Sequence, residues 1–282
     1  METVQNSNYE NYSNTSEHYD KNRRAYGIDL ILGNLLLLNR SNLKLLDVGC
    51  GTGNFIYELN QAISQNNSIK NLIKEYHCVE PNEGMIKIAQ NKNPNIIIKK
   101  TDGENLPFKN DEFDVIICTQ VLHHLIVPNK QGKYKRLKKT LNEMSRVIKK
   151  DGIIIINSTS PVQLKGFWYN DLSKTVQKRM LKYLIPNEII DKFFKSKSFN
   201  NISFINDTSL LWKNDYFNPQ GPLKKSWRDC DSMWALVEDK ELKEIIKLVT
   251  KMNEENKMVN YIKRKDKFRL KYGQSTFILI KK

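Results

Sequence analysis

The run Leu45–Phe55, LLDVGCGTGNF, constrains the fold of this chain more than any other segment. It begins as an apolar strand, passes through Gly49, Gly51 and Gly53, and continues into a predicted helix from about Asn54 to Ser64. Glycine lets the backbone bend sharply and approach a ligand closely, and the N-terminus of the helix directs amide donors at that ligand. The run therefore predicts a strand–turn–helix unit that binds a nucleotide-like group.

Short apolar runs alternate with helical patterns along the chain, which predicts crossover units around a parallel sheet. Continuous apolar runs of this kind are typical of strands that helices cover on both faces. The expected strands are Leu43–Val48, Tyr76–Val79, Asn95–Lys99, Phe113–Cys118, Ile153–Asn157, Ile202–Ile205 and Thr276–Ile280. The fold class is therefore expected to be α/β.

Helical periodicity predicts further elements between these strands and before the first of them. Ile28–Leu38 is the longest apolar candidate, but Asp29, Gly33 and Asn34 interrupt it. A buried amphipathic helix is therefore expected there, rather than a membrane span. The other expected helices are Asn54–Ser64, one that begins after Pro81, Tyr134–Lys149, Asn187–Phe199 and Asp239–Met252.

The chain of 282 residues carries a formal net charge of +15, which raises the hypothesis of a nucleic-acid partner. The cations are mostly lysine, 37 against 9 arginines, whereas proteins that read nucleic acid usually rely on arginine. An AT-rich, codon-biased genome would give any protein this composition. The basic segment Lys130–Lys150, with nine Lys or Arg and one Glu, is expected to face solvent on an outer layer. A nucleic-acid partner is thus not expected.

The cysteines and the N-terminus bear on metal binding and on the compartment. Cys50, Cys78, Cys118 and Cys230 are scattered and form neither a CxxC pair nor a zinc-ligand spacing, so reduced thiols and no metal are expected. The N-terminus is polar and lacks a basic start followed by an apolar stretch, so no secretory signal is expected. These features favour a cytoplasmic protein.

The motifs around the glycine turn narrow the kind of nucleotide-like group. The turn has the spacing GxGxG, not the GxGxxG of dinucleotide dehydrogenases, and Glu80 ends the second strand, where an acid accepts hydrogen bonds from a ribose. Four further motifs follow in order: VEPNEGMI (Val79–Ile86), TDGENLPF (Thr101–Phe108), FDVIICTQVLHHL (Phe113–Leu125) and RVIKKDGIIII (Arg146–Ile156). Together they resemble the class I S-adenosylmethionine-dependent methyltransferases related to ubiquinone and menaquinone biosynthesis enzymes. The resemblance is strong over Leu43–Ser158 and weak elsewhere.

This resemblance implies a fold, a cofactor and a set of binding residues. The fold would be a Rossmann-like, mostly parallel sheet of seven strands with helices on both faces and the last strand antiparallel. The cofactor would be S-adenosylmethionine, with S-adenosylhomocysteine as product. The implied binding residues are Asp47, Gly49, Cys50, Gly51 and Gly53 for the methionine part, Glu80 for the ribose, Pro81 and Met85 beside the adenine, Asp102, Gly103 and Glu104 at the adenine edge, and Thr119 and Gln120 near the sulfonium.

Two histidines are candidates for catalysis. His123 and His124 follow the fourth strand, where the reacting methyl group is expected. A neutral imidazole can take a proton from a hydroxyl or an amine, because its pKa lies near the working pH. The alternative is that one or both residues cap the following helix or fill a polar gap.

The remaining segments are expected to surround the core, which spans 43–211 together with 274–282. Residues 1–42 are expected to form a helical lid, in which Tyr19 and Arg23 close over the cofactor, with ordinary surface packing as the alternative. Residues 212–273 are expected to form an insertion before the last strand that covers the substrate site. The candidates for substrate contact are Trp168, Trp227, Arg228 and Trp234. Alternatively, the aromatic residues form a core that fixes the insertion to the domain.

The expected function is methyl transfer from S-adenosylmethionine to a small-molecule acceptor by in-line displacement at carbon. The protein would mainly supply alignment and exclude water. The charge motivates a second hypothesis, an RNA or protein methyltransferase, although the chain has neither a [DN]PP[YF] tetrapeptide nor a Pro-Cys nucleophile. A third is a non-catalytic cofactor-binding module. The sequence indicates the methyl donor and leaves the acceptor and the oligomeric state open.

Overall fold

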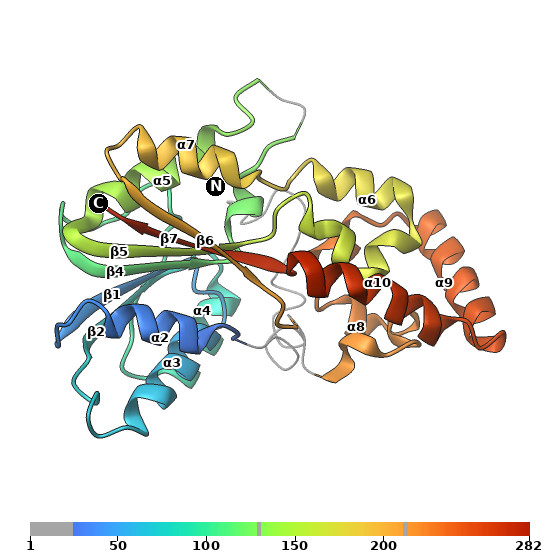
Figure 1. Ribbon diagram of the computed structural model, residues 1–282, viewed down its shortest axis with the longest axis horizontal. Helices are drawn as coiled ribbons and strands as arrows, with labels where there is room; N and C mark the ends of the chain where they lie inside the picture. The colour runs from blue at the N-terminus through green and yellow to red at the C-terminus, as the bar shows by residue number, and fades with distance from the viewer. Residues whose placement is uncertain (1–24, 129–130, 211–213) are drawn as a thin grey trace.

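A seven-stranded sheet forms the centre of the protein in the computed structural model, which describes residues 25–128, 131–210 and 214–282 (Figure 1). The strands lie in the order β3-β2-β1-β4-β5-β7-β6. Their bounds are β1 Leu43–Val48, β2 Ile73–Val79, β3 Ile97–Lys99, β4 Phe113–Thr119, β5 Ile148–Ser158, β6 Asn201–Asp207 and β7 Ser275–Lys281. Each of the seven expected strands is thus present. Five are longer than expected, β5 most of all, and β3 is shorter.

The pairing of the strands confirms the expected topology. β1 lies between β2 and β4 and is parallel to both, whereas β7 is antiparallel to its neighbours β5 and β6. The sheet is therefore Rossmann-like and mostly parallel, with the last strand antiparallel. The chain runs outward from β1 to β3 and then returns to β4 on the other side of β1. Ligands of open α/β sheets bind at such a reversal of strand order, beyond the carboxyl ends of the strands.

Helices cover both faces of the sheet, one group below it and one above it in Figure 1. The lower group is α2 Ile28–Leu36, α3 Asn54–Ser64 and α4 Glu83–Lys92, and the upper group is α5 Lys135–Val147 and α7 Asn187–Lys195. Side chains of β5 alternate between two cores. Ile153 and Ile155 pack in the core that includes α2 and α3, and Ile154 and Ile156 pack in the core that includes α5 and α7. Because both faces are buried, the strand reads as a continuous apolar run.

The longest apolar segment of the sequence forms a short helix with one buried side and not a membrane span. α2 has nine residues and buries Ile31 and Leu35 against the sheet. Across the described ranges, no helix is both long and apolar enough to cross a membrane.

A helical lobe stands beside the sheet, on the right in Figure 1. Its helices are α6 Lys174–Leu181, α8 Lys225–Arg228, α9 Asp239–Glu254 and α10 Met258–Tyr272, with several short 3-10 turns. Two separate segments build the lobe, one that follows β5 and one that follows β6. α10 packs against the turn Gln163–Gly166, which follows β5, and then leads into β7. The lobe is therefore attached at the end of the sheet where the parallel strands finish.

An aromatic cluster forms the interior of the helical lobe. Its members are Trp168, Tyr169, Tyr216, Trp227 and Trp234. The Tyr169 ring lies 5.5 Å from the Trp227 ring and 6.2 Å from the Trp234 ring, measured between centroids. The Tyr169 hydroxyl donates a hydrogen bond to Asp231 at 2.7 Å, and Trp168 Nε1 donates to the Tyr216 carbonyl at 2.9 Å. The polar atoms of these rings are thus largely satisfied inside the cluster.

Helix α10 was not predicted from the sequence. Its packed face includes the buried Arg269, which pairs with Asp266, and the half-buried Lys265, which pairs with Asp171. These charged residues interrupt the apolar periodicity that would reveal a helix. The proposed domain division at residue 212 stays a prediction, and in the structure the earlier segment 163–181 packs together with 214–272.

Candidate active site

A cavity lies at the carboxyl ends of β1, β2 and β4, where the strand order reverses. Its wall includes the glycine turn after β1, Glu80 after β2, and Thr119 and Gln120 at the end of β4. Tyr26 and Phe55 add aromatic surface. Parallel strands bring these residues together, because their carboxyl ends meet at one edge of the sheet.

The glycine turn between β1 and α3 presents backbone to the cavity. A Cβ at Gly49 would lie 2.6 Å from Val121 Cγ2, and one at Gly53 would lie 2.7 Å from Asn93 Nδ2, so these two glycines allow close packing inside the protein. A Cβ at Gly51, whose φ is +55°, would meet no atom of the described residues within 4 Å. The space beside Gly51 therefore leaves room for a ligand directly against the backbone.

Glu80 links the glycine turn to the start of α4. Its Oε2 accepts a hydrogen bond from the Gly51 N–H at 3.1 Å, and its Oε1 accepts one from the Asn82 N–H at 2.9 Å. Burial raises the pKa of Glu80 to about 7, although both backbone hydrogen bonds act against that rise. A carboxyl group held in this way can accept hydrogen bonds from vicinal hydroxyls of a ligand.

Asp47 is a fully buried carboxylate near the end of β1, behind the glycine turn. Neither of its carboxylate oxygens accepts a hydrogen bond from a described residue. Burial, together with the negative charge of Glu80, raises the pKa of Asp47 to about 8. A buried carboxylate without a partner is unfavourable unless a cation or donor satisfies it. Asp47 therefore fits a ligand that brings a positively charged amine.

The loop after β3 supplies another wall of the cavity through Asp102 and Gly103. The Asp102 carboxylate accepts the Glu104 N–H at 3.0 Å, and the Glu104 side chain pairs with Arg136. Arg136 and Thr140, one turn apart on α5, line the cavity, and sequence reasoning missed both. The signal for them was the i, i+4 spacing, which places two residues on one helix face. The Thr140 hydroxyl oxygen is buried and has no hydrogen-bond partner among the described residues, so a ligand can satisfy it.

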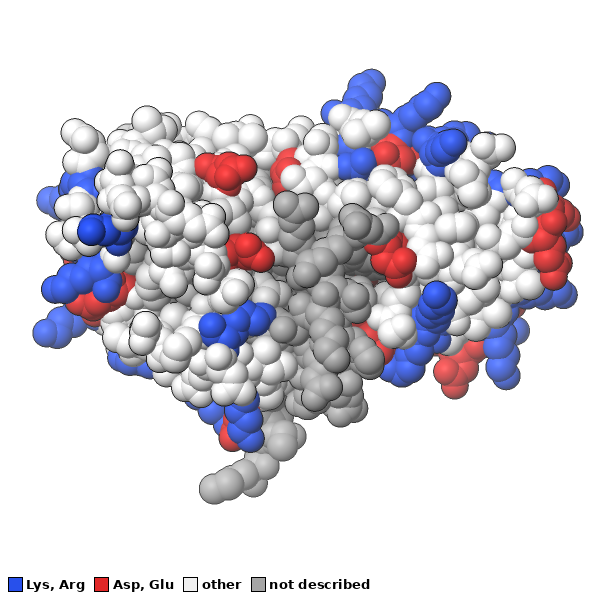
Figure 2. All heavy atoms as spheres, turned by 90° about the horizontal axis from the view of Figure 1, so that it is seen from below, with Lys and Arg blue, Asp and Glu red and all other residues white. Residues whose placement is uncertain are grey.

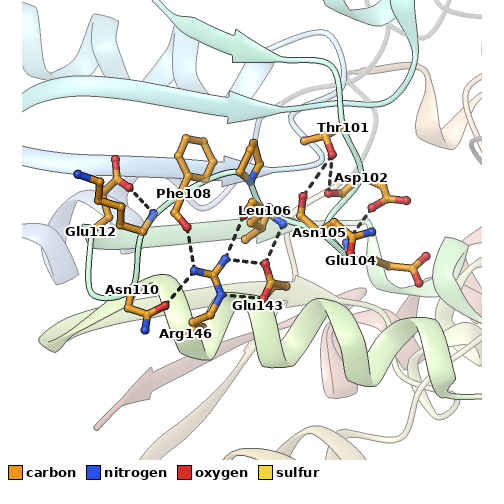
Figure 3. Close-up of polar contacts among 12 residues, drawn as sticks. Thr101, Asp102, Glu104, Asn105, Leu106, Phe108, Asn110, Glu112, Glu143 and Arg146 are labelled. Carbon is orange, nitrogen blue, oxygen red and sulfur yellow. Dashed lines mark hydrogen bonds and ion pairs between the residues drawn. The ribbon is translucent and has the colours of Figure 1, made fainter.

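Arg146 holds the same loop from behind, as Figure 3 shows. Its guanidinium donates to the carbonyls of Leu106 and Phe108 at 3.0 and 2.8 Å and pairs with Glu143 at 2.7 Å. Glu143 in turn accepts the Leu106 N–H at 2.8 Å, and Arg146 keeps the pKa of Glu143 below its usual value. The loop conformation therefore depends on two side chains of α5, Arg146 and Glu143, neither of which lines the cavity.

The structure brings most of the expected cofactor residues together. Those that line the cavity are Gly49, Cys50, Gly51, Glu80, Pro81, Met85, Asp102, Gly103, Thr119 and Gln120. Asp47 lies behind the turn, Gly53 precedes α3, and Glu104 faces α5, so these three lie outside the wall. Tyr19 and Arg23 lie outside the described residues. The role of each residue toward a cofactor stays a prediction.

The two candidate catalytic histidines occupy different places. Both lie in the 3-10 turn Leu122–Leu125, with ring centroids 4.0 Å apart. His124 lines the cavity, whereas His123 is buried and is not part of the wall. The geometry therefore favours His124 over His123 as the group that can reach a bound acceptor.

The expected substrate contacts Trp168, Trp227, Arg228 and Trp234 lie in the helical lobe and not in the wall of this cavity. The three tryptophans belong to the buried aromatic cluster, and Arg228 donates to the Pro222 carbonyl at 2.8 Å. These contacts suit the alternative of an aromatic core, while contact with an acceptor stays a prediction.

Comparison with known proteins agrees with this fold. A family model described as "Methyltransferase domain" matches residues 46–156. The chain is 25% identical over 167 residues to the ubiquinone/menaquinone biosynthesis C-methyltransferase UbiE of Campylobacter jejuni, covering 56% of this chain and 66%, just under two thirds, of that protein. It is 25% identical over 209 residues to demethylmenaquinone methyltransferase of Lysinibacillus sphaericus, covering 71% and 79%.

A solved structure shows the same fold over most of the chain. It is the crystal structure of a protein proposed to be a methyltransferase of an antibiotic biosynthesis pathway in Anabaena variabilis. The two share a TM-score of 0.65 and 20% identity, and the match covers 89% of this chain and 96% of that one.

The sheet, the glycine turn and the matching family together define a class I, Rossmann-like methyltransferase domain whose cofactor is S-adenosylmethionine. Within that class, the chain is similar to the ubiquinone/menaquinone biosynthesis C-methyltransferases, which confirms the resemblance seen in the motifs. The residues present fit this cofactor, because Asp47 lacks a partner for its charge and Gly51 leaves space against the backbone.

Proposed function

We propose that this chain transfers the methyl group of S-adenosylmethionine to a small-molecule acceptor by in-line displacement at carbon. The observation that carries the proposal is the buried, unpartnered carboxylate of Asp47 behind the glycine turn. The names of relatives support the acceptor class. They include enzymes of ubiquinone and menaquinone biosynthesis and, at 26% identity, the phthiotriol/phenolphthiotriol dimycocerosates methyltransferase of Mycobacterium leprae.

Each side of the cavity has a role in this proposal. Asp47, buried behind the glycine turn, would stabilise the charged amine of the methionine part through its negative charge, and Glu80 would accept hydrogen bonds from the ribose hydroxyls. Asp102 and Gly103 would border the adenine. The bound cofactor supplies a methyl group activated by a sulfonium, so the chain itself needs to bind, orient and exclude water.

His124 is our candidate for handling a proton of the acceptor. It lines the cavity next to the end of β4, and a neutral imidazole can accept a proton at physiological pH. Such a base is needed only where the attacking group must lose a proton.

The parts around the core would shape the acceptor site. The helical lobe is attached at the carboxyl side of the sheet, the side on which the cavity opens. This arrangement supports the proposal that residues 212–273 cover the acceptor. Tyr19 and Arg23 remain lid candidates on the basis of the sequence.

The face of the molecule shown in Figure 2 gives little support to an RNA acceptor. Its Lys and Arg side chains lie in several separate groups, with Asp and Glu among them. A nucleic-acid track would be expected to run as a continuous basic surface to the reacting centre.

Transfer of label from methyl-tritiated S-adenosylmethionine tests the proposed function. The acceptor panel would hold reduced short-chain demethylmenaquinone, phenols, catechols, amines and thiols, with total RNA and a protein extract as separate arms. Label is expected in at least one small molecule. It is expected to fall when Asp47 is substituted, and also when His124 is substituted if the attacking group of the acceptor must lose a proton. Label only in RNA, in a reaction that high salt suppresses, would contradict the proposal, as would no label in any arm.

A further inference from the structure

Asn157 connects two residues of the cavity wall without lining the cavity itself. It lies near the end of β5 and is fully buried. Its Oδ1 accepts hydrogen bonds from the Tyr26 hydroxyl at 2.8 Å and from Gln120 Nε2 at 2.7 Å. Its Nδ2 donates to Ser275 Oγ on β7 at 3.0 Å. One buried carboxamide thus holds Tyr26 and Gln120 from behind and is anchored to the neighbouring strand.

The backbone of Gln120 is fixed to the same residue. Gln120 directly follows β4 with φ at +56°, in the left-handed region that a glutamine rarely adopts. Its N–H donates to the Asn157 carbonyl at 2.8 Å. A strained backbone that the surroundings hold in place at a cavity is typical of a functional constraint.

These contacts determine which end of the Gln120 amide is available. Because Nε2 donates to Asn157, Oε1 points away from that residue. No hydrogen bond between described residues occupies Oε1, and Gln120 lines the cavity. A carbonyl oxygen accepts hydrogen bonds and cannot donate them. The ligand group that it fits therefore carries an O–H or an N–H.

We propose that Asn157 is a positioning residue for methyl transfer. It holds Gln120 so that Oε1 accepts a hydrogen bond from the acceptor, and the acceptor class is therefore a compound with a hydroxyl or amine group close to the atom that is methylated. This inference rests on the proposed function, because it requires a small acceptor to bind in this cavity.

Two probes of equal shape test the inference without turnover. 1-Naphthol and 1-methylnaphthalene differ in that only the first donates a hydrogen bond. Their affinities for the protein saturated with S-adenosylhomocysteine can be measured by ligand-observed NMR. The preference for 1-naphthol is expected to fall about tenfold in Gln120→Leu and in Asn157→Leu, which is the effect of one lost hydrogen bond of about 1.4 kcal/mol.

Two further variants separate positioning from general stability. Thr159→Val removes another buried hydrogen bond beyond the end of β5, from Thr159 Oγ1 to the Gln274 carbonyl at 3.1 Å, and is expected to keep the wild-type preference. Asn157→Asp retains the acceptor oxygen and, when protonated, a donor toward Ser275. Because a carboxylate also accepts from Gln120 Nε2 and from the Tyr26 hydroxyl, and the Ser275 hydroxyl can donate to it, this variant is expected to keep the preference in either protonation state.

The outcomes distinguish this inference from the proposed function. An unchanged preference in both leucine variants overturns it, and so does a wild-type protein that binds neither probe. If Asn157→Asp behaves like Asn157→Leu at every pH, Gln120 presents its nitrogen instead, which also overturns it. If Asn157→Leu lowers the affinity for S-adenosylhomocysteine as much as the affinity for 1-naphthol, Asn157 supports only the cofactor, and this result also overturns the inference. If no acceptor is methylated, the proposed function is contradicted. The preference for 1-naphthol over 1-methylnaphthalene still tests whether Gln120 accepts a hydrogen bond from a ligand.

Discussion

Asp47 and Glu80 show how single residues prepare this cavity for a charged ligand. Burial raises the pKa of Asp47 to about 8 and that of Glu80 to about 7, and the charge of Glu80 adds to the rise at Asp47. A ligand that brings an ammonium group to Asp47 and hydroxyl donors to Glu80 compensates for the lost hydration of both. The two buried carboxyl groups therefore favour ligand binding, although they lower the stability of the ligand-free protein.

The raised pKa of Asp47 predicts a pH dependence for binding of S-adenosylmethionine. Below pH 8 the ligand-free protein holds a proton on Asp47, and an ammonium group favours the ionised form, so binding releases that proton. Affinity is expected to rise by at least about tenfold per pH unit between pH 6 and 7.5, because Glu80, with its pKa raised to about 7, also loses its proton when the ligand donates to it. Calorimetry across this range checks the slope. Asp47→Asn should bind more weakly with a flatter profile, and a flat profile in the wild type would count against the role of Asp47.

The open space beside Gly51 leads to a second prediction about a single residue, namely the effect of a larger side chain on cofactor affinity. Gly51→Val would fill the space beside the turn and is expected to lower affinity for S-adenosylmethionine by at least about a hundredfold, because the backbone could no longer approach the ligand. Gly132→Val is the matched control, since Gly132 also has positive φ, +83°, but lies outside the cavity wall. Equal binding by both variants would show that the cofactor lies elsewhere.

Arg146 illustrates how one element, α5, controls a loop of the site. Arg146→Ala would remove the hydrogen bonds to Leu106 and Phe108 and leave Glu143 without its partner. Affinity for S-adenosylmethionine is expected to fall about tenfold, because the loop at Asp102 must then be ordered on binding. Hydrogen exchange of residues 101–108 should also increase.

Arg179→Ala provides the control for this prediction. Arg179 makes a bidentate ion pair with Glu241 in the helical lobe, at 2.6 and 2.8 Å, and lies outside the cavity wall. The Arg179→Ala substitution should leave the affinity for S-adenosylmethionine and the hydrogen exchange of residues 101–108 unchanged. A similar loss of affinity in both variants would indicate a general loss of stability.

Elements with a regular apolar pattern could be predicted from the sequence, and elements with charged buried faces could not. β1 and α3 have the expected bounds, because a strand covered on both faces and an amphipathic helix give clear patterns. α10 was missed because Arg269 and Lys265 lie on its packed side. Asp266 lies three residues before Arg269 on the same helix, whereas Asp171, the partner of Lys265, is far away in the sequence and is brought close only by the fold.

For the site as a whole, the sequence was informative where the strands end. Glu80, Thr119 and the glycine turn follow strands that a parallel sheet aligns at one edge. Tyr26 and Asn157 come from distant parts of the chain and meet through a hydrogen bond that no local pattern encodes. Long-range contacts of this kind depend on the packing of the whole molecule.

The aromatic cluster of the helical lobe is expected to contribute to the stability of the whole molecule. Trp227→Ala would leave a large hole in the aromatic cluster and is expected to lower the free energy of unfolding by about 3–5 kcal/mol. Leu270→Ala, at a side chain that is 59% exposed in the same lobe, should change it by less than about 0.5 kcal/mol. Urea denaturation measures both. Unchanged stability of Trp227→Ala with a raised KM for the acceptor would instead favour substrate contact.

Calorimetric titration of the full chain with S-adenosylmethionine tests the central claim most directly, namely that the cavity beside Asp47, Gly51 and Glu80 binds this cofactor. The account predicts one site per chain in the wild type and an affinity at least about tenfold weaker in Glu80→Gln, because the ribose hydroxyls lose an acceptor. Absence of binding in the wild type, or equal affinity in the two proteins, would contradict it.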